Sequence, residues 1–229
     1  MTRALEAFIR CSTEITPVRL VPEIRLHLAS DSQRIFQRAE ELERPGERFP
    51  AFWAFAWPGG QALARYLIDT PAIVAGRRVI DIGAGSGIAA IAAMYAGAAS
   101  ALAADVDPMA ELAIRCNAAA NSVDVETTTS DILGWPVDAG LVVIADLVYE
   151  PALATRVAAF LESAAAAGTD VLLADRTTAR RPPLSFSLIA EYDAPLTPDM
   201  HDLNRERARL WRLDRRRGRK MRAGRGQAI

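Results

Sequence analysis

The distribution of apolar and polar residues along the chain predicts alternating strands and helices. Short runs that are almost wholly apolar are typical of strands buried on both faces of a parallel sheet, and longer segments with helical spacing stand between them. One strand is predicted from Val79 to the glycines that follow it. The other predicted strands of this series are 99–104, 123–128, 141–145 and 170–174, and the predicted helices are 62–68, 88–96, 108–120 and 152–167.

Two further runs, 185–192 and 207–213, are predicted to form a final pair of strands joined by a loop that contains Pro195 and Pro198. They complete a seven-stranded sheet. Parallel strands joined by crossover helices are typical of the doubly wound architecture. We therefore predict an α/β fold with a Rossmann-like seven-stranded sheet and helices on both faces.

The first fifty residues are predicted to be an N-terminal helical extension. One helix is expected to begin within 5–10, and a second spans 32–42 until Pro45-Gly46 ends it. No chemistry is visible there, so we expect this region to pack against the sheet. The predicted organisation is an extension at 1–48, a single domain at 49–214 and a basic tail at 215–229.

A glycine-rich loop follows the strand that starts at Val79. Gly83, Gly85 and Gly87 alternate with small residues and open a helix, as expected where a backbone takes positive φ or lies against a ligand. The dinucleotide fingerprint would place a third glycine where this chain has Ile88. Asp81, two residues before the first glycine, suits a positively charged ligand better than a pyrophosphate. An ordinary strand-to-helix turn is the alternative.

Further acids follow the later strands, at the sheet edge where open α/β proteins bind ligands. Asp105 stands where a carboxylate can accept from both hydroxyls of a ribose. Asp131 and Ile132 are candidates for the amine and face of an adenine, although an acid such as Asp131 is often a turn residue. Asp146 and Tyr149 are candidates for the chemistry, with a helix N-cap as the alternative for Asp146.

Five aromatic residues crowd into 49–57, just before a Pro-Gly-Gly turn. We expect Phe52 and Phe55 to fill the core beneath the sheet, because large rings bury much apolar area. Trp53 and Trp57 are candidates for the wall of a cofactor pocket, since an indole face attracts a sulfonium or an ammonium group.

Composition excludes several function classes. The 229 residues are 51% apolar and 24% charged, which fits one α/β domain with extensions. Cys11 and Cys116 lack metal-ligand spacing, and His27 and His201 stand alone, so we predict no metal site, no disulfide framework and no Ser-His-Asp arrangement.

Targeting signals indicate the cellular compartment, and the distribution of charge indicates a possible contact of the C-terminal tail. No run is long and apolar enough to span a membrane, and acids occur among the first thirty residues. We therefore expect a protein of the cytoplasm, or of the mitochondrial matrix in a eukaryote. The net charge is −1, yet the tail 215–229 holds seven basic residues and no acid. A flexible tail is the plainer interpretation, and contact with RNA is the alternative.

Four motifs together resemble a known family. The runs FWAFAWPGGQALARYLIDTP, VIDIGAGSGIAAIAA, ALAADVDPMAELAIRCNAAAN and IADLVYEP are similar to the lysine methyltransferases that modify the β subunit of electron transfer flavoprotein, members of a seven-β-strand class I methyltransferase family. The resemblance covers about 48–192. It departs after the fifth strand, where Ala174-Asp175-Arg176-Thr177-Thr178 replaces a Gly-Asp-Pro-Gly-Arg-like segment, which leaves the substrate-side loop open.

The resemblance implies an S-adenosylmethionine-dependent protein-lysine N-methyltransferase whose partner is the electron transfer flavoprotein β subunit. It assigns Asp146 and Tyr149 to the acceptor lysine. It assigns seven residues to the S-adenosylmethionine pocket: Trp57, Asp81, Gly83, Gly85, Asp105, Asp131 and Ile132. Ribosomal proteins are the alternative substrates. An NAD-dependent oxidoreductase lacks support here, because the chain has no Tyr-x-x-x-Lys pair, and a non-catalytic protein that contacts RNA through the tail stays open.

Overall fold

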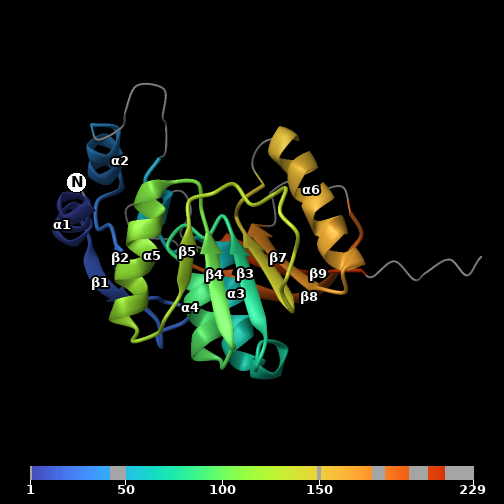
Figure 1. The fold of residues 1–229 in the computed structure, drawn as a ribbon. Helices are drawn as coiled ribbons and strands as arrows, with labels where there is room; N and C mark the ends of the chain where they lie inside the picture. The colour runs from blue at the N-terminus through green and yellow to red at the C-terminus, as the bar shows by residue number, and fades with distance from the viewer. Residues whose placement is uncertain (1, 42–49, 149–150, 177–183, 196–205, 215–229) are drawn as a thin grey trace, which may run out of the picture.

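A computed structural model describes residues 2–41, 50–148, 151–176, 184–195 and 206–214 (Figure 1). Its centre is a seven-stranded sheet in the order β5-β4-β3-β6-β7-β9-β8, in which β9 runs antiparallel to both of its neighbours. This confirms the predicted seven-stranded α/β fold and its final strand pair. The strands are β3 (Arg78–Ile82), β4 (Ser100–Ala104), β5 (Glu126–Thr128), β6 (Leu141–Ala145), β7 (Asp170–Arg176), β8 (Phe186–Ala194) and β9 (Glu206–Leu213).

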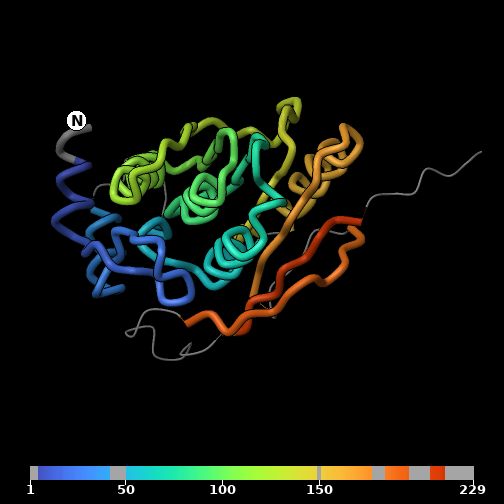
Figure 2. Tube along the Cα trace, turned by 90° about the horizontal axis from the view of Figure 1, so that it is seen from below, coloured from blue at the N-terminus to red at the C-terminus, as the bar shows by residue number. Residues whose placement is uncertain are grey.

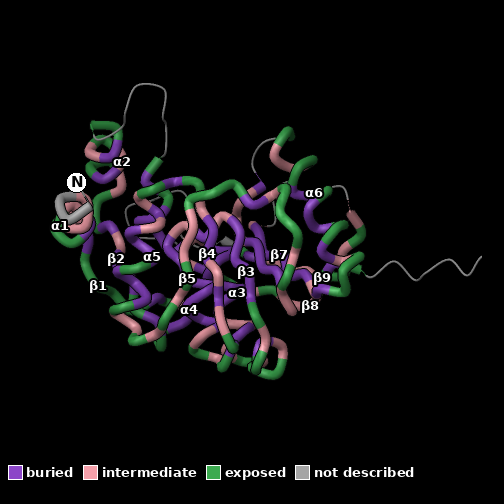
Figure 3. The backbone as a smooth tube through the Cα atoms, in the orientation of Figure 1, coloured by how far each residue is buried: buried purple, intermediate pink, exposed green. Residues whose placement is uncertain are grey.

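The sheet has an apolar core on each face, because successive residues of its buried strands point to opposite sides. One core joins the sheet to helices α3 (Pro58–Asp69), α4 (Ile88–Tyr95) and part of α5 (Pro108–Ala120). The other joins it to α6 (Pro151–Ala166). Figure 3 shows the central strands buried along most of their length. Helices thus cover both faces, as predicted.

The connection between β5 and β6 contains no helix, which differs from a strict strand-helix alternation. Ile132, Leu133 and Val137 of this connection pack on the same core as α6 instead. β5 also begins at Glu126, three residues later than the predicted strand.

Helix α3 begins at Pro58 rather than at the predicted position 62. Proline suits the first turn of a helix. Gly59 and Gly60 stay helical because their neighbours lie too close for a side chain: a Cβ on Gly60 would lie 2.9 Å from Ile88 Cγ2. The Pro-Gly-Gly sequence is therefore the closely packed start of the helix, not a turn before it.

The N-terminal extension lies at the end of the molecule away from α6 (Figures 1 and 2). It consists of α1 (Thr2–Ser12), the antiparallel pair β1 (Glu14–Pro17) and β2 (Arg25–Leu28), and α2 (Ser32–Glu40). Together with the short helix η1 (Phe52–Ala54) it packs on α5. Val18, Val21, Ile24 and Leu26 of the extension join the apolar core that the sheet forms with α3 and α4, in keeping with the expected packing against the sheet, whereas α1 and α2 pack on α5.

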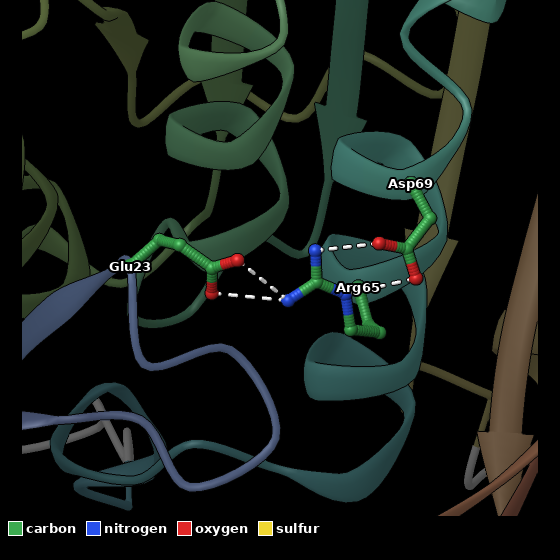
Figure 4. Close-up of polar contacts among 3 residues, drawn as sticks. All are labelled: Glu23, Arg65 and Asp69. Carbon is green, nitrogen blue, oxygen red and sulfur yellow. Dashed lines mark hydrogen bonds and ion pairs between the residues drawn. The ribbon is translucent and has the colours of Figure 1, made fainter.

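Polar contacts fasten this extension to the domain at several points, both at the surface and inside. Arg65 of α3 donates to both oxygens of Glu23, at 2.8 and 3.0 Å, and to Asp69 (Figure 4). Deeper inside, the Asn117 side chain accepts from His27 N at 2.7 Å and donates to Ser86 O at 2.8 Å. The Asn117 side chain thus links β2 to the glycine-rich loop.

No helix within the described ranges has the length and apolar character needed to cross a bilayer. The basic tail 215–229 lies outside the described residues, so its predicted flexibility and RNA contact stay predictions.

Candidate active site

A cavity of about 600 Å³ opens at the edge where the parallel strands end. Cavities of this size accommodate ligands the size of a nucleoside with an attached amino acid. Eight of the nine residues predicted from the sequence line it: Trp57, Asp81, Gly83, Gly85, Asp105, Asp131, Ile132 and Asp146. The ninth, Tyr149, lies outside the described residues. The predicted site therefore assembles around one cavity.

The glycine-rich loop requires its glycines for two different reasons. Gly83, Gly85 and Gly87 have φ of 66°, 53° and 77°, in the left-handed region that favours glycine. A Cβ on Gly83 would lie 2.5 Å from Leu147 Cδ1, whereas a Cβ on Gly85 would enter open space in the cavity. Gly85 thus keeps clear the space that a ligand would occupy.

Asp105 is held in place by two backbone groups. Its Oδ2 accepts from Gly85 N at 2.8 Å and its Oδ1 from Asp107 N at 3.0 Å. Burial raises the pKa of this carboxyl, while the two N–H groups oppose the rise. The fixed carboxyl group, with acceptor capacity left on each oxygen, fits the predicted contact with a ribose diol.

Asp81 belongs to β3, lies next to the start of helix α4 and is 2% exposed. Its Oδ2 accepts from Ala90 N, an N–H of the first helical turn, at 3.1 Å. Burial raises its pKa to about 7, and the charge of Asp105 adds to the rise. A cationic ligand nearby would stabilise the ionised form, as expected for an acid facing an ammonium or sulfonium group.

Asp131 and Ile132 border the cavity on the side of α6. Asp131 Oδ1 accepts from Leu133 N at 3.1 Å, a turn contact, and its other oxygen pairs with Arg156. The hydrogen bond from Arg156 lowers the pKa of Asp131. Asp131 thus serves the turn and also lines the cavity, while Ile132 offers an apolar surface that is 4% exposed.

The aromatic segment contributes differently from the prediction. Phe55 is fully buried as expected, but Phe52 is 42% exposed and lines the cavity, so its predicted place in the core is wrong. Phe52 packs edge to face on Trp57, with ring centroids 5.7 Å apart, and its carbonyl accepts from Trp57 Nε1. Trp53 also borders the cavity but is 1% exposed, behind the other two rings.

Asp146 follows β6 in a strained backbone conformation. Its φ is 50°, which is uncommon outside glycine and often marks functional sites. Asp146 Oδ2 accepts from Gly60 N at 3.1 Å, so the carboxyl caps α3 and not α6, the helix of the alternative interpretation. A Cβ on Gly59 would lie 2.7 Å from the same oxygen. Burial raises the pKa of Asp146 to about 6.

Sequence reasoning missed the acid behind Asp146. Asp175, near the end of β7, is 5% exposed and interacts with Asp146, so that each carboxyl group shifts the pKa of the other. Burial and the charge of Asp146 raise its pKa to about 8. The sequence did contain a signal for this acid. Asp175 directly continues the buried run 171–174, and the alternation of side chains along a strand places it on the face of the sheet that α6 covers.

The sheet order, the glycine-rich loop and the row of acids define an S-adenosylmethionine-dependent methyltransferase. A family model described as ribosomal protein L11 methyltransferase (PrmA) matches residues 62–178. The structure of ribosomal protein L11 methylase from Lactobacillus delbrueckii is 26% identical, with a TM-score of 0.50 over 67% of this chain and 77% of that one. A 16S rRNA methyltransferase from T. thermophilus, solved with AdoMet and guanosine, supports the fold alone: it is 19% identical, with a TM-score of 0.52 over 70% of this chain and 43% of that one.

Sequence relatives identify the particular family. The electron transfer flavoprotein beta subunit lysine methyltransferase of Xenopus laevis is 40% identical over 74% of this chain and 69% of its own length. The protein of the same name from Mus musculus is 37% identical over 75% of this chain and 68% of its own length. The chain belongs to the electron transfer flavoprotein beta subunit lysine methyltransferase family, which confirms the predicted resemblance.

Proposed function

We propose that this enzyme methylates one or more lysines of the electron transfer flavoprotein β subunit. The relatives that share more than a third of their residues with this chain bear that substrate in their names. The observation that carries the proposal is the position of Asp146, a strained and hydrogen-bonded carboxyl group at the wall of the cofactor cavity. A carboxylate placed there can hold the ammonium group of a lysine next to a methyl donor.

The cavity fits S-adenosylmethionine on the chemistry of its donors. Asp105 would hold the ribose, the open space at Gly85 would admit the ligand, and Asp81 would face its positive charges. Asp131, Ile132 and the indole of Trp57 would complete the pocket. When bound, the cofactor supplies a methyl group already activated on a sulfonium, which a neutral amine can take up by direct in-line displacement without a covalent enzyme intermediate.

The acceptor side must bring in a lysine and remove its proton. A free lysine has a pKa of about 10.4, so it arrives as the ammonium. Asp146 captures and orients it, and Tyr149, outside the described residues, helps to align it. Exclusion of bulk solvent favours loss of the proton, which a water molecule accepts. The amine lone pair is then free to attack.

Mass spectrometry of purified electron transfer flavoprotein β subunit, incubated with the enzyme and S-adenosylmethionine, tests the substrate. We expect lysine masses raised by methyl groups with the native enzyme and with Asp138→Asn, whose side chain is fully exposed. Asp146→Ala should abolish the gain while cofactor binding persists. Full activity of Asp146→Asn, with unchanged affinity for the protein substrate, would contradict the role of this acid.

A ribosomal protein is the second candidate substrate. The PrmA family model spans the catalytic domain, and the structure that is 26% identical is a ribosomal protein L11 methylase. Ribosomal protein L11 belongs in the same assay as a parallel substrate. Methylation of L11 without methylation of the flavoprotein would make L11 the substrate and leave the assignment as a protein methyltransferase unchanged.

We also propose that the enzyme works in the cytoplasm, or in the mitochondrial matrix of a eukaryote. Cys11 and Cys116 are both free thiols, as is usual for proteins of reducing compartments, which supports this proposal. Fractionation of cells that produce the tagged full chain tests the location.

A further inference from the structure

Two carboxyl groups meet at the wall of the cavity. Asp146 follows β6 and Asp175 lies in the adjacent strand β7, and the Asp146 backbone N–H donates to Ala174 O at 3.1 Å. The two carboxyl groups lie close enough for each to shift the pKa of the other. Asp146 lines the cavity, whereas Asp175 is 5% exposed and is absent from the lining. Asp175 therefore acts on a bound acceptor only through Asp146.

A hydrogen bond between two carboxyl groups requires a proton, because ionised carboxylates only accept. Asp146 Oδ2 already accepts from Gly60 N, and Asp175 Oδ1 accepts from Arg176 N at 2.8 Å. Asp146 Oδ1 is fully buried, and no N–H or O–H group of the described residues is assigned to it. Buried oxygens normally have a hydrogen-bond partner, and a proton on the neighbouring Asp175 would give Asp146 Oδ1 one.

The charges around the pair favour one negative charge over two. Arg176 lowers the pKa of both acids, and from α3 only the backbone N–H groups of Gly59 and Gly60 act on Asp146. Arg209, opposite Asp175 in the β7–β9 register, donates to Glu191 of β8. On the α6 side, Arg156 pairs with Asp131. Among the described residues, Arg176 is the cation that acts on both acids, and two neighbouring carboxyl groups cannot both ionise at low cost.

We propose that Asp175 is the proton-bearing partner of Asp146, a positioning residue that donates a hydrogen bond to the acceptor-binding carboxylate and limits the site to one negative charge. This rests on the proposed role of Asp146. Two negative charges would hold the lysine ammonium more tightly and would oppose loss of its proton, which the reaction requires. The proton on Asp175 thus preserves capture of the lysine and eases its conversion to the nucleophilic amine.

Infrared spectroscopy of the enzyme without any protein substrate tests the protonation directly. We expect the native-minus-Asp175→Asn difference spectrum at pH 7 to contain the C=O stretching band of a protonated carboxyl group. The matched variant Asp138→Asn, at a fully exposed position, should give no such band. Absence of the band from the Asp175 difference spectrum would overturn the proposal.

Kinetics test the positioning role. Asp175→Asn should keep kcat at pH 7 within about twofold, because its amide donates to Asp146 in place of the proton, whereas Asp175→Ala should lose roughly tenfold or more. The native enzyme should lose kcat at alkaline pH as Asp175 ionises, and Asp175→Asn should lack that decline. Loss of kcat in Asp175→Asn as large as in Asp175→Ala, with unchanged circular dichroism and cofactor affinity, would overturn the proposal.

The two proposals fail in different ways. If the flavoprotein is not the substrate, the infrared band still decides whether Asp175 is protonated, and the kinetics are repeated with L11. If Asp146→Asn keeps full activity while the band is present, the role of Asp146 is wrong and Asp175 positions nothing for the reaction.

Discussion

Replacing Asn117 should weaken both the fold and the cofactor site. This side chain is fully buried and joins two backbone groups that lie far apart in the sequence. It accepts from His27 N of β2 and donates to Ser86 O of the glycine-rich loop. His27 in turn contacts Thr13, whose hydroxyl donates to Ile9 O of α1. Asn117 is thus the inner link between the N-terminal extension and the cavity.

The magnitude follows from the two groups that Asn117→Ala would leave without partners. A buried donor or acceptor that loses its partner costs about 1–3 kcal/mol, so the two cost about 2–6 kcal/mol. Domains of this kind unfold at about 5–15 kcal/mol, and the loss should therefore move the urea midpoint clearly. Because Ser86 lines the cavity, affinity for S-adenosylmethionine should fall as well.

Asn121, one turn further along α5, is the matched control. It makes the same kind of contacts, accepting from Arg25 N at 2.9 Å and donating to Arg25 O, but at the exposed end of the strand. Water can replace these bonds, so Asn121→Ala should cost only about 0.5–1.5 kcal/mol and leave cofactor affinity unchanged. Equal destabilisation of the two variants would refute the reasoning.

Three further outcomes follow from the site. Gly59→Ala should lower kcat about tenfold or more with less effect on cofactor affinity, because its Cβ would lie 2.7 Å from Asp146 Oδ2; a normal kcat would contradict the close packing seen there. Asp105→Asn should weaken S-adenosylmethionine binding roughly tenfold by calorimetry, since the charged acceptor for the ribose is lost. Because the folded-state pKa of Asp81 is raised, the stability of the unliganded enzyme should fall as the pH rises through about 7. Cofactor binding near pH 7 should release protons, and the Asp81→Asn variant should release fewer. Calorimetry in buffers of different ionisation heat measures this release.

The sequence singled out residues that line one cavity because their signals are local. Strand-end acids and alternating glycines follow from the geometry of a parallel sheet, and Asp105 and Gly85 both line the cavity. Helix 108–120 has the predicted bounds for the same reason, with Asp107 as N-cap and proline in the first turn.

What the sequence did not predict depends on contacts between distant segments. Asp146 and Asp175 lie together because β6 and β7 are adjacent strands, and the periodicity within either strand does not predict that adjacency. Phe52 lies at the cavity because Phe55, three residues later, fills the core position beside Phe36. Apolar residues of α1 and α2 pack with α5 and η1, an arrangement that patterning along one segment cannot assign.

Helices α3 and α4 both lack a side-chain cap from their own N-cap residues, and each receives one from an acid of the cavity. Asp146 serves α3 and Asp81 serves α4, each through the backbone N–H of the third residue of the helix. Carboxyl groups that line the cavity therefore hold the first turns of two helices that pack on one face of the sheet. A negative charge near a helix N-terminus is stabilising, so any change in the ionisation of either acid also changes the stability of the helix that it caps.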